Sequence, residues 1–480
     1  MLKLAQNIHL ISIIVPLFMG FCSFMVRDRK PRVVNVAYMG LSFLMFCCTV
    51  YATYRLNLIR GETYYSVIGN WSKAMGIELK INLVRSIAVM ALFLISILFF
   101  ATTWKGGTDY AFRGFVCIML CGANGIALTN DIFNSYVFFE IVCITNYIIY
   151  AHGSRAECVK NAYNYMILSS FAGVIFLLAA GVLYQITGNL NLDIIRNSLS
   201  TLQNNKTVNA IYVLFLLAMM FKLGVYPLHN VLFGIYKNLQ LKYLFVVAGI
   251  SSIVYPFFTM KMVISLFGTA IVADNEYLNM VLKICGGIGF LFFNIMAFTT
   301  KSVVHFIVSL AFAQTSLFAF CVPYFNNNMM TIGVALSIVS TSLIKTCMLA
   351  MTYKFQCNFG IVDIKKTDLS TINSGYKFVF ALLLFIISGM PFTMVFMSKW
   401  YSLIAVINSA YSPAWAAIVI VGFAIDIGAC FGFMMQILTR NQSRSVNICT
   451  NKIFIAAVAF IVLFVVFGAM FVGYLNNFTN

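Results

Sequence analysis

The stretch FKLGVYPLHN, residues 221–230, decides the fold because it interrupts an apolar helix. Pro227 has no backbone N–H and Gly224 loosens the turn before it, so neighbouring carbonyls lose their helical partners. A second interruption, SGMPFTMVFMSKWYSL at 388–403, places Pro391 in the middle of another apolar run. Broken helices at corresponding places in two halves of a chain are typical of transporters built from inverted repeats, whose unwound segments line an ion site.

The composition of the whole chain agrees with a membrane protein. Of the 480 residues, 62% are hydrophobic and 9% are charged, and the mean hydropathy is +0.94. These values lie far outside the range of soluble domains, and no segment longer than a loop remains for a soluble module or for nucleic-acid binding. The 31 Lys and Arg against 13 Asp and Glu are explained by the enrichment of basic residues in cytoplasmic loops.

Hydropathy predicts an all-α integral membrane protein with about fourteen transmembrane helices. The predicted spans are 6–25, 34–56, 83–103, 111–128, 130–150, 162–183, 208–232, 242–265, 280–300, 302–322, 329–353, 376–409, 412–437 and 452–474. Basic residues recur in every second loop: Arg27, Arg29, Lys30, Arg32, Lys105, Arg113, Arg155, Lys160, Lys237, Lys242, Lys354, Lys365, Lys366, Arg440 and Arg444. These loops are expected in the cytoplasm, which places both termini outside it. The first span is expected to stay in the protein as a helix.

Cysteines and histidines indicate no cofactor site. The 13 cysteines show no C-x2-C spacing and the four histidines form no metal-binding pattern, so no disulfide framework, iron–sulfur cluster, haem or zinc site is expected. No Ser/His or His/Asp pair has an active-site-like spacing, which favours a transporter subunit over an enzyme such as a membrane acyltransferase.

Five of the ionisable residues are singled out because they lie well inside the predicted spans or beside a helix break. Glu140 lies within DIFNSYVFFEIVCITNYIIY (131–150) in the fifth span, Lys222 in the seventh, Lys345 in the eleventh, Lys399 in the twelfth and Asp426 in the thirteenth. A carboxylate or ammonium at bilayer depth costs several kcal/mol unless it is paired or neutral. Lysines in such a setting readily gain and lose a proton. The set therefore predicts a proton relay.

Each of these residues also has a purely structural interpretation. Glu140 and Lys222 could form a structural ion pair, and Lys345 and Lys399 could extend toward an interface. Asp426 could cap a kink or bind a neighbouring helix. His229, two residues after Pro227, could satisfy the freed carbonyls instead of passing protons.

Several stretches together resemble a known family. They are ANGIALTNDIFNSYVFFEI (123–141), LYQITGNLNL (183–192), FKLGVYPLHNVLFGIY (221–236), STSLIKTCMLA (340–350) and GMPFTMVFMSKW (389–400). In combination they resemble the antiporter-like subunits shared by Mrp-type sodium/proton antiporters and respiratory complex I, over about residues 110–440. The first stretch is more similar to the pattern of the D-type Mrp subunits than to that of the complex I subunits.

The resemblance implies two inverted five-helix repeats, formed by spans 4–8 and 9–13, each with a broken helix. The implied division is 1–110 for the first three helices, 111–265 and 280–437 for the two repeats, and 452–474 for the last helix. It further implies that Glu140 pairs with Lys222, and that protons pass along Lys222, Lys345 and Lys399 through the middle of the membrane.

The implied function is that of a membrane subunit of a multisubunit sodium/proton antiporter in a bacterial inner membrane. Its partners would be the other membrane subunits, protons, sodium ions and the lipid bilayer, with no cofactor. Two alternatives stay open. One is a redox-driven proton-pumping subunit of a respiratory or hydrogenase-type NADH:quinone oxidoreductase complex, and the other is a diverged scaffold subunit that does not conduct.

The sequence departs from the family pattern at two places. The eighth span usually carries a lysine or histidine, and the matching position here is Ile253, with only Ser251 and Ser252 as polar neighbours. The histidine that often precedes the eleventh-span lysine is replaced by Ser340 or Thr341. A serine with water can relay a proton but cannot hold one, so the link from Lys222 to Lys345 is the part of the relay that the sequence leaves open.

Overall fold

The structure is a computed structural model. It describes residues 2–27, 30–73, 76–104, 109–152, 156–200, 206–359, 374–409, 413–439 and 452–471. Several basic residues of the predicted cytoplasmic loops lie outside the described residues, namely Arg29, Lys105, Arg155, Lys365, Lys366, Arg440 and Arg444.

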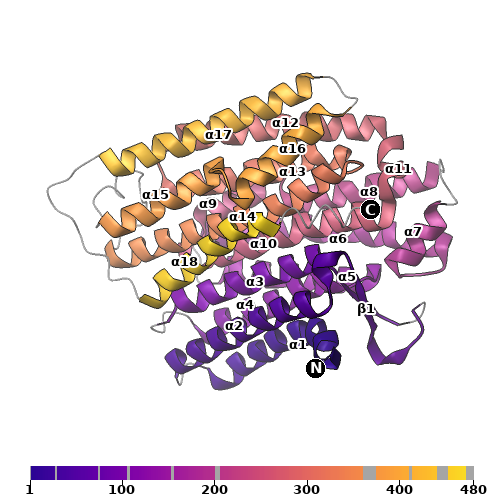
Figure 1. Cartoon of the computed structure of the whole chain (residues 1–480), viewed down its shortest axis with the longest axis horizontal. Helices are drawn as coiled ribbons and strands as arrows, with labels where there is room; N and C mark the ends of the chain where they lie inside the picture. Colours follow the sequence, from indigo (N-terminus) through magenta and orange to yellow (C-terminus); the bar gives the residue numbers. More distant parts are fainter. Residues whose placement is uncertain are drawn as a thin grey trace. The chain divides into compact units, whose positions relative to one another are not determined.

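The chain divides into two compact units, the first of which comprises Met1–Leu223 and Ile253–Val281 among its described parts. Its helices, labelled in Figure 1, are α1 (Leu2–Val26), α2 (Pro31–Arg55), α3 (Leu83–Thr102), α4 (Tyr110–Leu128), α5 (Ile132–Ala151), α6 (Ala156–Thr187), α7 (Leu192–Ser200), α8 (Lys206–Leu223) and α11 (Gly268–Asp274). Within this unit α1 packs on α4, α2 on α3, and α6 on α8.

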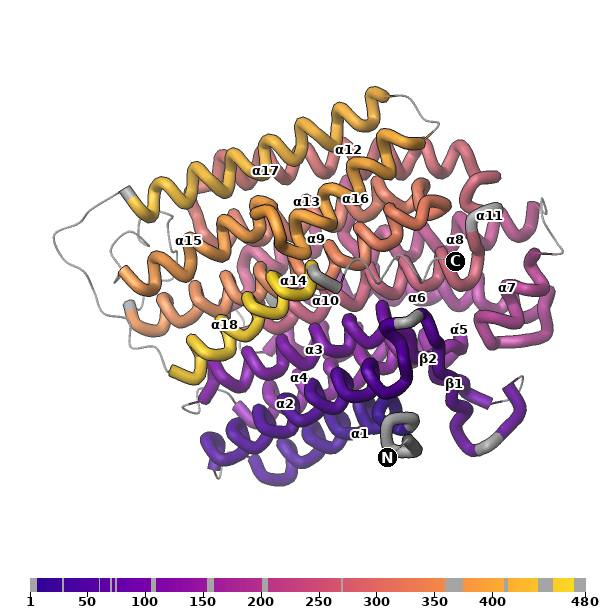
Figure 2. Tube along the Cα trace, viewed as in Figure 1, coloured from indigo at the N-terminus to yellow at the C-terminus, as the bar shows by residue number. Residues whose placement is uncertain are grey.

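The second unit comprises Gly224–Ser252 and Leu282–Gly473. Its helices are α9 (Asn230–Asn238), α13 (Val303–Cys321), α14 (Asn328–Phe359), α15 (Ser374–Gly389), α16 (Met394–Ile407), α17 (Ala414–Thr439) and α18 (Lys452–Phe467). Two helices cross the division along the chain, α10 (Leu241–Met262) and α12 (Glu276–Thr299). Figure 2 shows α12 and α17 side by side, and Asn294 Nδ2 of α12 donates to the Gly422 carbonyl of α17 at 3.1 Å.

Within the described residues, thirteen segments are long and apolar enough to cross a membrane, and α18 is a shorter apolar helix. Together they match the fourteen predicted spans in order and place. Burial separates inner from outer helices: 94% of the apolar window of α14 is buried, against 28% for α17 and 33% for α6. Apolar side chains on the outer helices face the surroundings, as expected of helices in contact with lipid.

Both predicted interruptions are present. The seventh span ends at Leu223, passes through Gly224 with φ of 64°, and resumes as α9 at Asn230. The twelfth span ends as α15 at Gly389 with φ of 102° and resumes as α16 after Thr393. A positive φ is easily adopted by glycine, which explains why each break begins at one. The second break occurs five spans after the first.

The structure also contains a β-hairpin that the sequence did not indicate. Strand β1 (Tyr64–Val67) pairs antiparallel with β2 (Glu78–Ile81), with Tyr64 opposite Ile81. Leu79 forms a further bridge with Thr129, directly after α4. The hairpin is therefore tied to the corner between α4 and α5.

Candidate functional site

Lys222 lies at the end of α8, one residue before the helix ends, and is only 1% exposed. Its Nζ donates to Ser169 Oγ of α6 at 2.5 Å and to Cys143 Sγ of α5 at 3.1 Å. The ammonium also lies over the Phe139 ring, 4.9 Å from the centroid. The break after Leu223 brings this charge into a pocket of three helices, where polar groups and an aromatic face partly replace its hydration.

Glu140 lies one turn before Cys143 on the same side of α5, yet it does not form an ion pair with Lys222. Its carboxylate points toward Gly173 of α6, where a Cβ atom would lie 2.8 Å from Glu140 Oε1. Among the described residues, the buried Oε1 atom has no hydrogen-bond partner. The carboxylate therefore occupies space that a glycine leaves open.

A network of hydroxyl and amide groups extends from the partners of Lys222. Tyr147 OH donates to Ser169 Oγ at 2.5 Å, and Cys143 Sγ lies 3.7 Å from Tyr255 OH. Asn146 Nδ2 donates to Tyr255 OH at 2.8 Å. The sequence analysis missed Tyr255, which lies in the eighth span two residues after Ile253. The signal that could have identified Tyr255 is its hydroxyl in an apolar span, because a buried tyrosine normally finds a hydrogen-bond partner.

In the second unit, Lys345 lies in α14 and is 5% exposed. It lines a small cavity together with Ser252, Ser342 and Thr346. The cavity measures about 10 Å³, room for about one water molecule. Among the described residues Lys345 takes part in no hydrogen bond or ion pair, so this cavity is the open space beside its ammonium.

The residues that replace the family histidine do not supply that partner. Ser340 Oγ donates to the Leu336 carbonyl and Thr341 Oγ1 to the Ser337 carbonyl, each one turn back along α14. Back-bonded hydroxyls of this kind are satisfied by their own helix.

Lys399 and Asp426 form an ion pair, with Lys399 Nζ 2.6 Å from Asp426 Oδ2. Lys399 Nζ also donates to the Ser388 carbonyl at 3.0 Å, one of the carbonyls freed by the break after Gly389. The side chains are 16% and 13% exposed. The pair therefore joins α16 to α17, and Asp426 points toward Lys399.

The structure does not place His229 beside a buried charge. Its ring stacks on Tyr226 with centroids 5.5 Å apart and meets Phe293 edge-on at 4.9 Å. Its Nδ1 atom is buried without a hydrogen-bond partner among the described residues. These contacts are those of a ring packed in an aromatic box.

Ile253, the expected position of the eighth-span lysine, is 1% exposed and belongs to the apolar core. A lysine does occur in this span, two turns later. Lys261 is 4% exposed, and its Nζ donates to the carbonyls of Ile126 at 2.7 Å and Thr129 at 3.0 Å. The sequence analysis missed Lys261 because it lies near the end of the apolar run, where a lysine normally extends to the surface.

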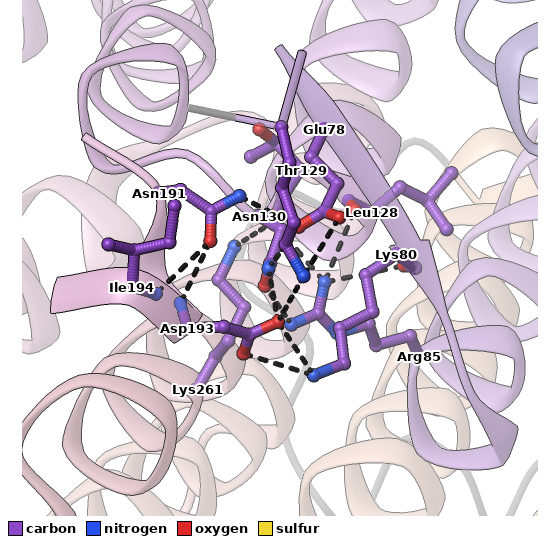
Figure 3. Close-up of polar contacts among 11 residues, drawn as sticks. Glu78, Lys80, Arg85, Leu128, Thr129, Asn130, Asn191, Asp193, Ile194 and Lys261 are labelled. Atoms are coloured by element: carbon purple, nitrogen blue, oxygen red, sulfur yellow. Dashed lines mark hydrogen bonds and ion pairs between the residues drawn. The ribbon is translucent and has the colours of Figure 1, made fainter. Parts of the chain in front are cut away.

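A polar cluster, here called the hairpin cluster, surrounds the α4–α5 corner (Figure 3). Its members are Lys73, Glu78, Lys80, Arg85, Asn130, Asn191 and Asp193. Glu78 Oε2 accepts from Asn130 Nδ2 and Asn191 Nδ2, both at 2.8 Å. Asp193 accepts from Asn130 at 3.0 Å and pairs with Lys80 at 3.2 Å.

Charge balance within the hairpin cluster sets its protonation. Burial by itself raises the pKa of Asp193, but Lys80, Asn130 and Lys73 outweigh burial and hold that pKa below its usual value. Burial by itself lowers the pKa of Lys73, but Glu78 and Asp193 outweigh it and raise that pKa. Asp193 and Lys73 are thus both charged near neutral pH. Within the described residues, no three His, Cys, Asp or Glu side chains are grouped so that they could hold a metal ion.

Two curated proteins are similar to this chain in sequence. The D subunit of the Na(+)/H(+) antiporter of Alkalihalophilus pseudofirmus is 28% identical over 229 residues, 47% of this chain and 46% of that protein. The alignment thus spans about half the length of that relative. The N subunit of the NADH-quinone oxidoreductase of Desulforudis audaxviator is 26% identical over 444 residues, 90% of this chain and 86% of that protein.

The fold has a close match among solved structures. A chain of the membrane-bound sulfane sulfur reductase, an archaeal respiratory membrane complex, superposes with a TM-score of 0.86 at 16% identity, over 98% of this chain and 96% of that one. A chain of the Mrp complex from Dietzia sp. DQ12-45-1b superposes with a TM-score of 0.82 at 15% identity, over 99% of this chain and 96% of that one, so the predicted antiporter-like fold is confirmed. A family model described as NADH:quinone oxidoreductase/Mrp antiporter, TM matches residues 129–427, more than half of the chain. The chain belongs to this NADH:quinone oxidoreductase/Mrp antiporter transmembrane family.

Proposed function

We propose that the chain is a membrane subunit of a multisubunit cation/proton antiporter and that Glu140, Lys222, Lys345 and Lys399 carry its protons. The observation that carries this proposal is the setting of Lys222. Its ammonium is buried at a helix break and donates to two uncharged groups, the Ser169 hydroxyl and the Cys143 thiol. Among the described residues, the buried Oε1 atom of the nearby Glu140 carboxylate has no hydrogen-bond partner. A lysine with two alternative partners can change its proton affinity by moving between them.

The proton affinity of Lys222 would depend on whether it contacts Ser169 and Cys143 or Glu140. With Lys222 at Ser169, the thiol and hydroxyl stabilise its ammonium only weakly. A movement toward Glu140 would add an attraction of about 4 kcal/mol at 4 Å and an effective dielectric constant of 20. The proton would then be held while Lys222 faces Glu140 and released when the two separate. The break after Leu223 allows the end of α8 to make this movement.

In the second unit, Lys345 and Lys399 would carry out the corresponding steps. Lys345 faces a cavity of water size, from which it can exchange a proton. Lys399 has its own counter-ion in Asp426, so it can remain charged until Asp426 is protonated. We assign Asp426 to the proton path on this contact. His229 remains a weaker candidate, since its surroundings are aromatic.

The remaining parts of the proposal rest on the relatives. The name of the Alkalihalophilus relative, a sodium/proton antiporter subunit, favours sodium as the coupled cation. The partners would be other membrane subunits of the same complex and the lipid around it. Basic residues in alternate loops favour an orientation with both termini outside the cytoplasm, and the organisms of the relatives favour a bacterial inner membrane. The division into repeats at 111–265 and 280–437 is part of the same proposal.

The test is pH-gradient-driven sodium/proton exchange in membrane vesicles that contain the chain with its partner subunits. We expect Lys222→Ala and Glu140→Gln each to abolish exchange while the complex still assembles. Lys237→Ala is the matched control, because Lys237 is an exposed lysine at the end of α9. Normal exchange in assembled Lys222→Ala complexes contradicts the proposal.

A second candidate function is that of a redox-driven proton pump. The observation in its favour is coverage: the alignment with the NADH-quinone oxidoreductase relative spans 90% of this chain, against 47% for the antiporter relative. Proton pumping that requires an electron donor and a quinone, and no exchange without them, supports this candidate.

A non-conducting scaffold is the third possibility, since Ile253 is apolar and Ser340 and Thr341 are satisfied by their own helix. If the chain is a scaffold, neither assay detects proton movement. If exchange appears only in the Ile253→Lys variant, the chain has a proton path that lost its eighth-span lysine.

A further inference from the structure

Helices α5 and α10 present matched side chains to each other in three successive layers. In the first layer, Cys143 lies 3.7 Å from Tyr255 OH. In the second, the rings of Phe139 and Phe258 lie 5.0 Å apart and 32° from parallel. In the third, Lys261 Nζ lies 3.4 Å from Ser135 Oγ.

The layers follow from helical spacing. Ser135, Phe139 and Cys143 are four residues apart on one face of α5, and α10 presents its residues at intervals of three. The outer layers are about 12 Å apart along α5.

The two outer layers each hold a buried ammonium. Lys222 contacts Cys143 and lies 4.9 Å from the centroid of the Phe139 ring. Lys261 lies 5.8 Å from the centroid of the Phe258 ring. The aromatic pair thus lies between the two lysines, with the Phe139 ring beside Lys222 and the Phe258 ring beside Lys261. Apolar rings exclude the water through which a proton would pass.

Lys261 is connected to the surface by polar contacts. Its Nζ shares the Thr129 carbonyl with Arg85 Nη1, which lies 3.3 Å from the same oxygen. Arg85 Nη2 donates to Asn130 Oδ1 at 3.2 Å, and Asn130 Nδ2 binds Glu78 and Asp193 (Figure 3).

The chain of contacts ends at Lys73, whose side chain is 45% exposed and pairs with Glu78 at 3.3 Å. Asp131, at the start of α5, is a further carboxylate whose charge acts on Lys261.

We propose that Lys261 is a second proton-binding site of the first unit, which exchanges protons with the aqueous phase through the hairpin cluster and is separated from Lys222 by the Phe139–Phe258 pair. The inference rests on the proposed function, because it places a second proton carrier beside Lys222. Loading adds one proton to the amine of Lys261 and unloading returns it. Asp131, the carboxylate whose charge acts on Lys261, passes the proton between Lys261 and water at the hairpin cluster, because the Thr129 carbonyl, Arg85 and Asn130 do not carry protons themselves.

A purely structural role for Lys261 is the competing explanation. Its ammonium binds carbonyls at the end of α4, where a positive charge is favourable. However, Arg85 already donates to the Leu128 and Thr129 carbonyls at 3.2 and 3.3 Å. The helix end therefore has one permanent cation, and a second one, buried and able to lose its proton, is not needed for capping.

Two substitutions separate the explanations because both keep N–H donors for the carbonyls. Lys261→Arg keeps the charge but cannot release its proton, and Lys261→Gln has no charge to release. We expect exchange to fall at least about tenfold in both, since loss of a proton carrier typically costs a factor of about 100 or more. Lys237→Arg is the matched control.

Wild-type exchange in either assembled Lys261 variant overturns the inference. Phe258→Leu tests it independently should both variants fail to assemble. This change removes one ring and is expected to let protons leak, so that an imposed pH gradient decays faster without sodium. An unchanged decay rate in that variant also overturns the inference.

Lys222→Ala in the same membranes distinguishes the two proposals. Loss of exchange there with normal exchange in the Lys261 variants rejects only the second site. Normal exchange in Lys222→Ala rejects the proposed function itself.

Discussion

The Lys399–Asp426 ion pair gives a prediction whose size follows from the structure. At 2.6 Å between Nζ and Oδ2, the gross attraction is about 6 kcal/mol for an effective dielectric constant of 20. Desolvation cancels part of it. Removal of one partner from a buried pair still costs about 3–5 kcal/mol, because the other charge is left alone. Since the side chains are 16% and 13% exposed, we expect about 3 kcal/mol for Asp426→Leu or Lys399→Met.

The double variant should recover most of that loss. Two apolar side chains can replace an ion pair with little change in the free energy of unfolding, so we expect Lys399→Met with Asp426→Leu within about 1 kcal/mol of the parent. Unfolding of the purified protein in sodium dodecyl sulfate, followed by circular dichroism, measures all three. Asp274→Leu is the control, because Asp274 is exposed at the end of α11.

Two results would refute this reasoning. One is a single variant as stable as the parent, and the other is a double variant whose loss equals the sum of the two single losses, which shows no coupling. We expect sodium/proton exchange to be lost in both single variants and not to return in the double variant, because neither methionine nor leucine carries a proton. The double variant would then have the stability of the parent but no exchange, which separates the two roles of the Lys399–Asp426 pair.

Three further predictions concern other parts of the first unit. Gly173→Ala should slow exchange, because its Cβ would lie 2.8 Å from Glu140 Oε1 and displace the carboxylate; Gly181→Ala, with open space around its Cβ, should keep exchange normal and raise stability by about 0.5–1 kcal/mol. The hairpin should stay closed above the ordinary aspartate pKa of about 3.9 and open as pH falls below it. The depressed pKa of Asp193 in the folded state contributes stability that is lost when the carboxylate is protonated; limited proteolysis of the hairpin between about pH 3 and 6 measures this, and in Asp193→Asn the pH dependence should weaken. Tyr255→Phe should lower the free energy of unfolding by about 1–3 kcal/mol, because the buried hydrogen bond from Asn146 Nδ2 to the Tyr255 hydroxyl is lost; an unfolding curve equal to that of the parent contradicts this.

The sequence predicted the features that depend on chain chemistry alone. The helix breaks follow from Gly224 with Pro227, and from Gly389 with Pro391, because these residues remove donors or allow positive φ. The spans follow from hydropathy, and the positions of Glu140, Lys222, Lys345, Lys399 and Asp426 inside them are visible in the sequence. Their role in proton transport stays a prediction.

Other features depend on contacts between distant segments. Asp426 meets Lys399 across 27 residues, and Asn191 reaches Glu78 across 113; neither contact has a periodic signal. The hairpin strands are only four residues long and lie in a polar stretch, too short for an alternating pattern to stand out. Lys261 was overlooked because its distance from the membrane surface depends on how α4 ends beside α10.

The hairpin cluster has a mechanical consequence for α5. Asp131 caps the start of this helix, where its carboxylate accepts from Asn134 N at 2.7 Å, and the preceding Asn130 is bound to both Glu78 and Asp193. The start of α5 is thereby hydrogen-bonded to two other segments of the first unit. These contacts restrain the helix that carries Glu140 and Cys143. In the proposed mechanism, α5 would hold Cys143 and Glu140 in place while the ammonium of Lys222 moves between them.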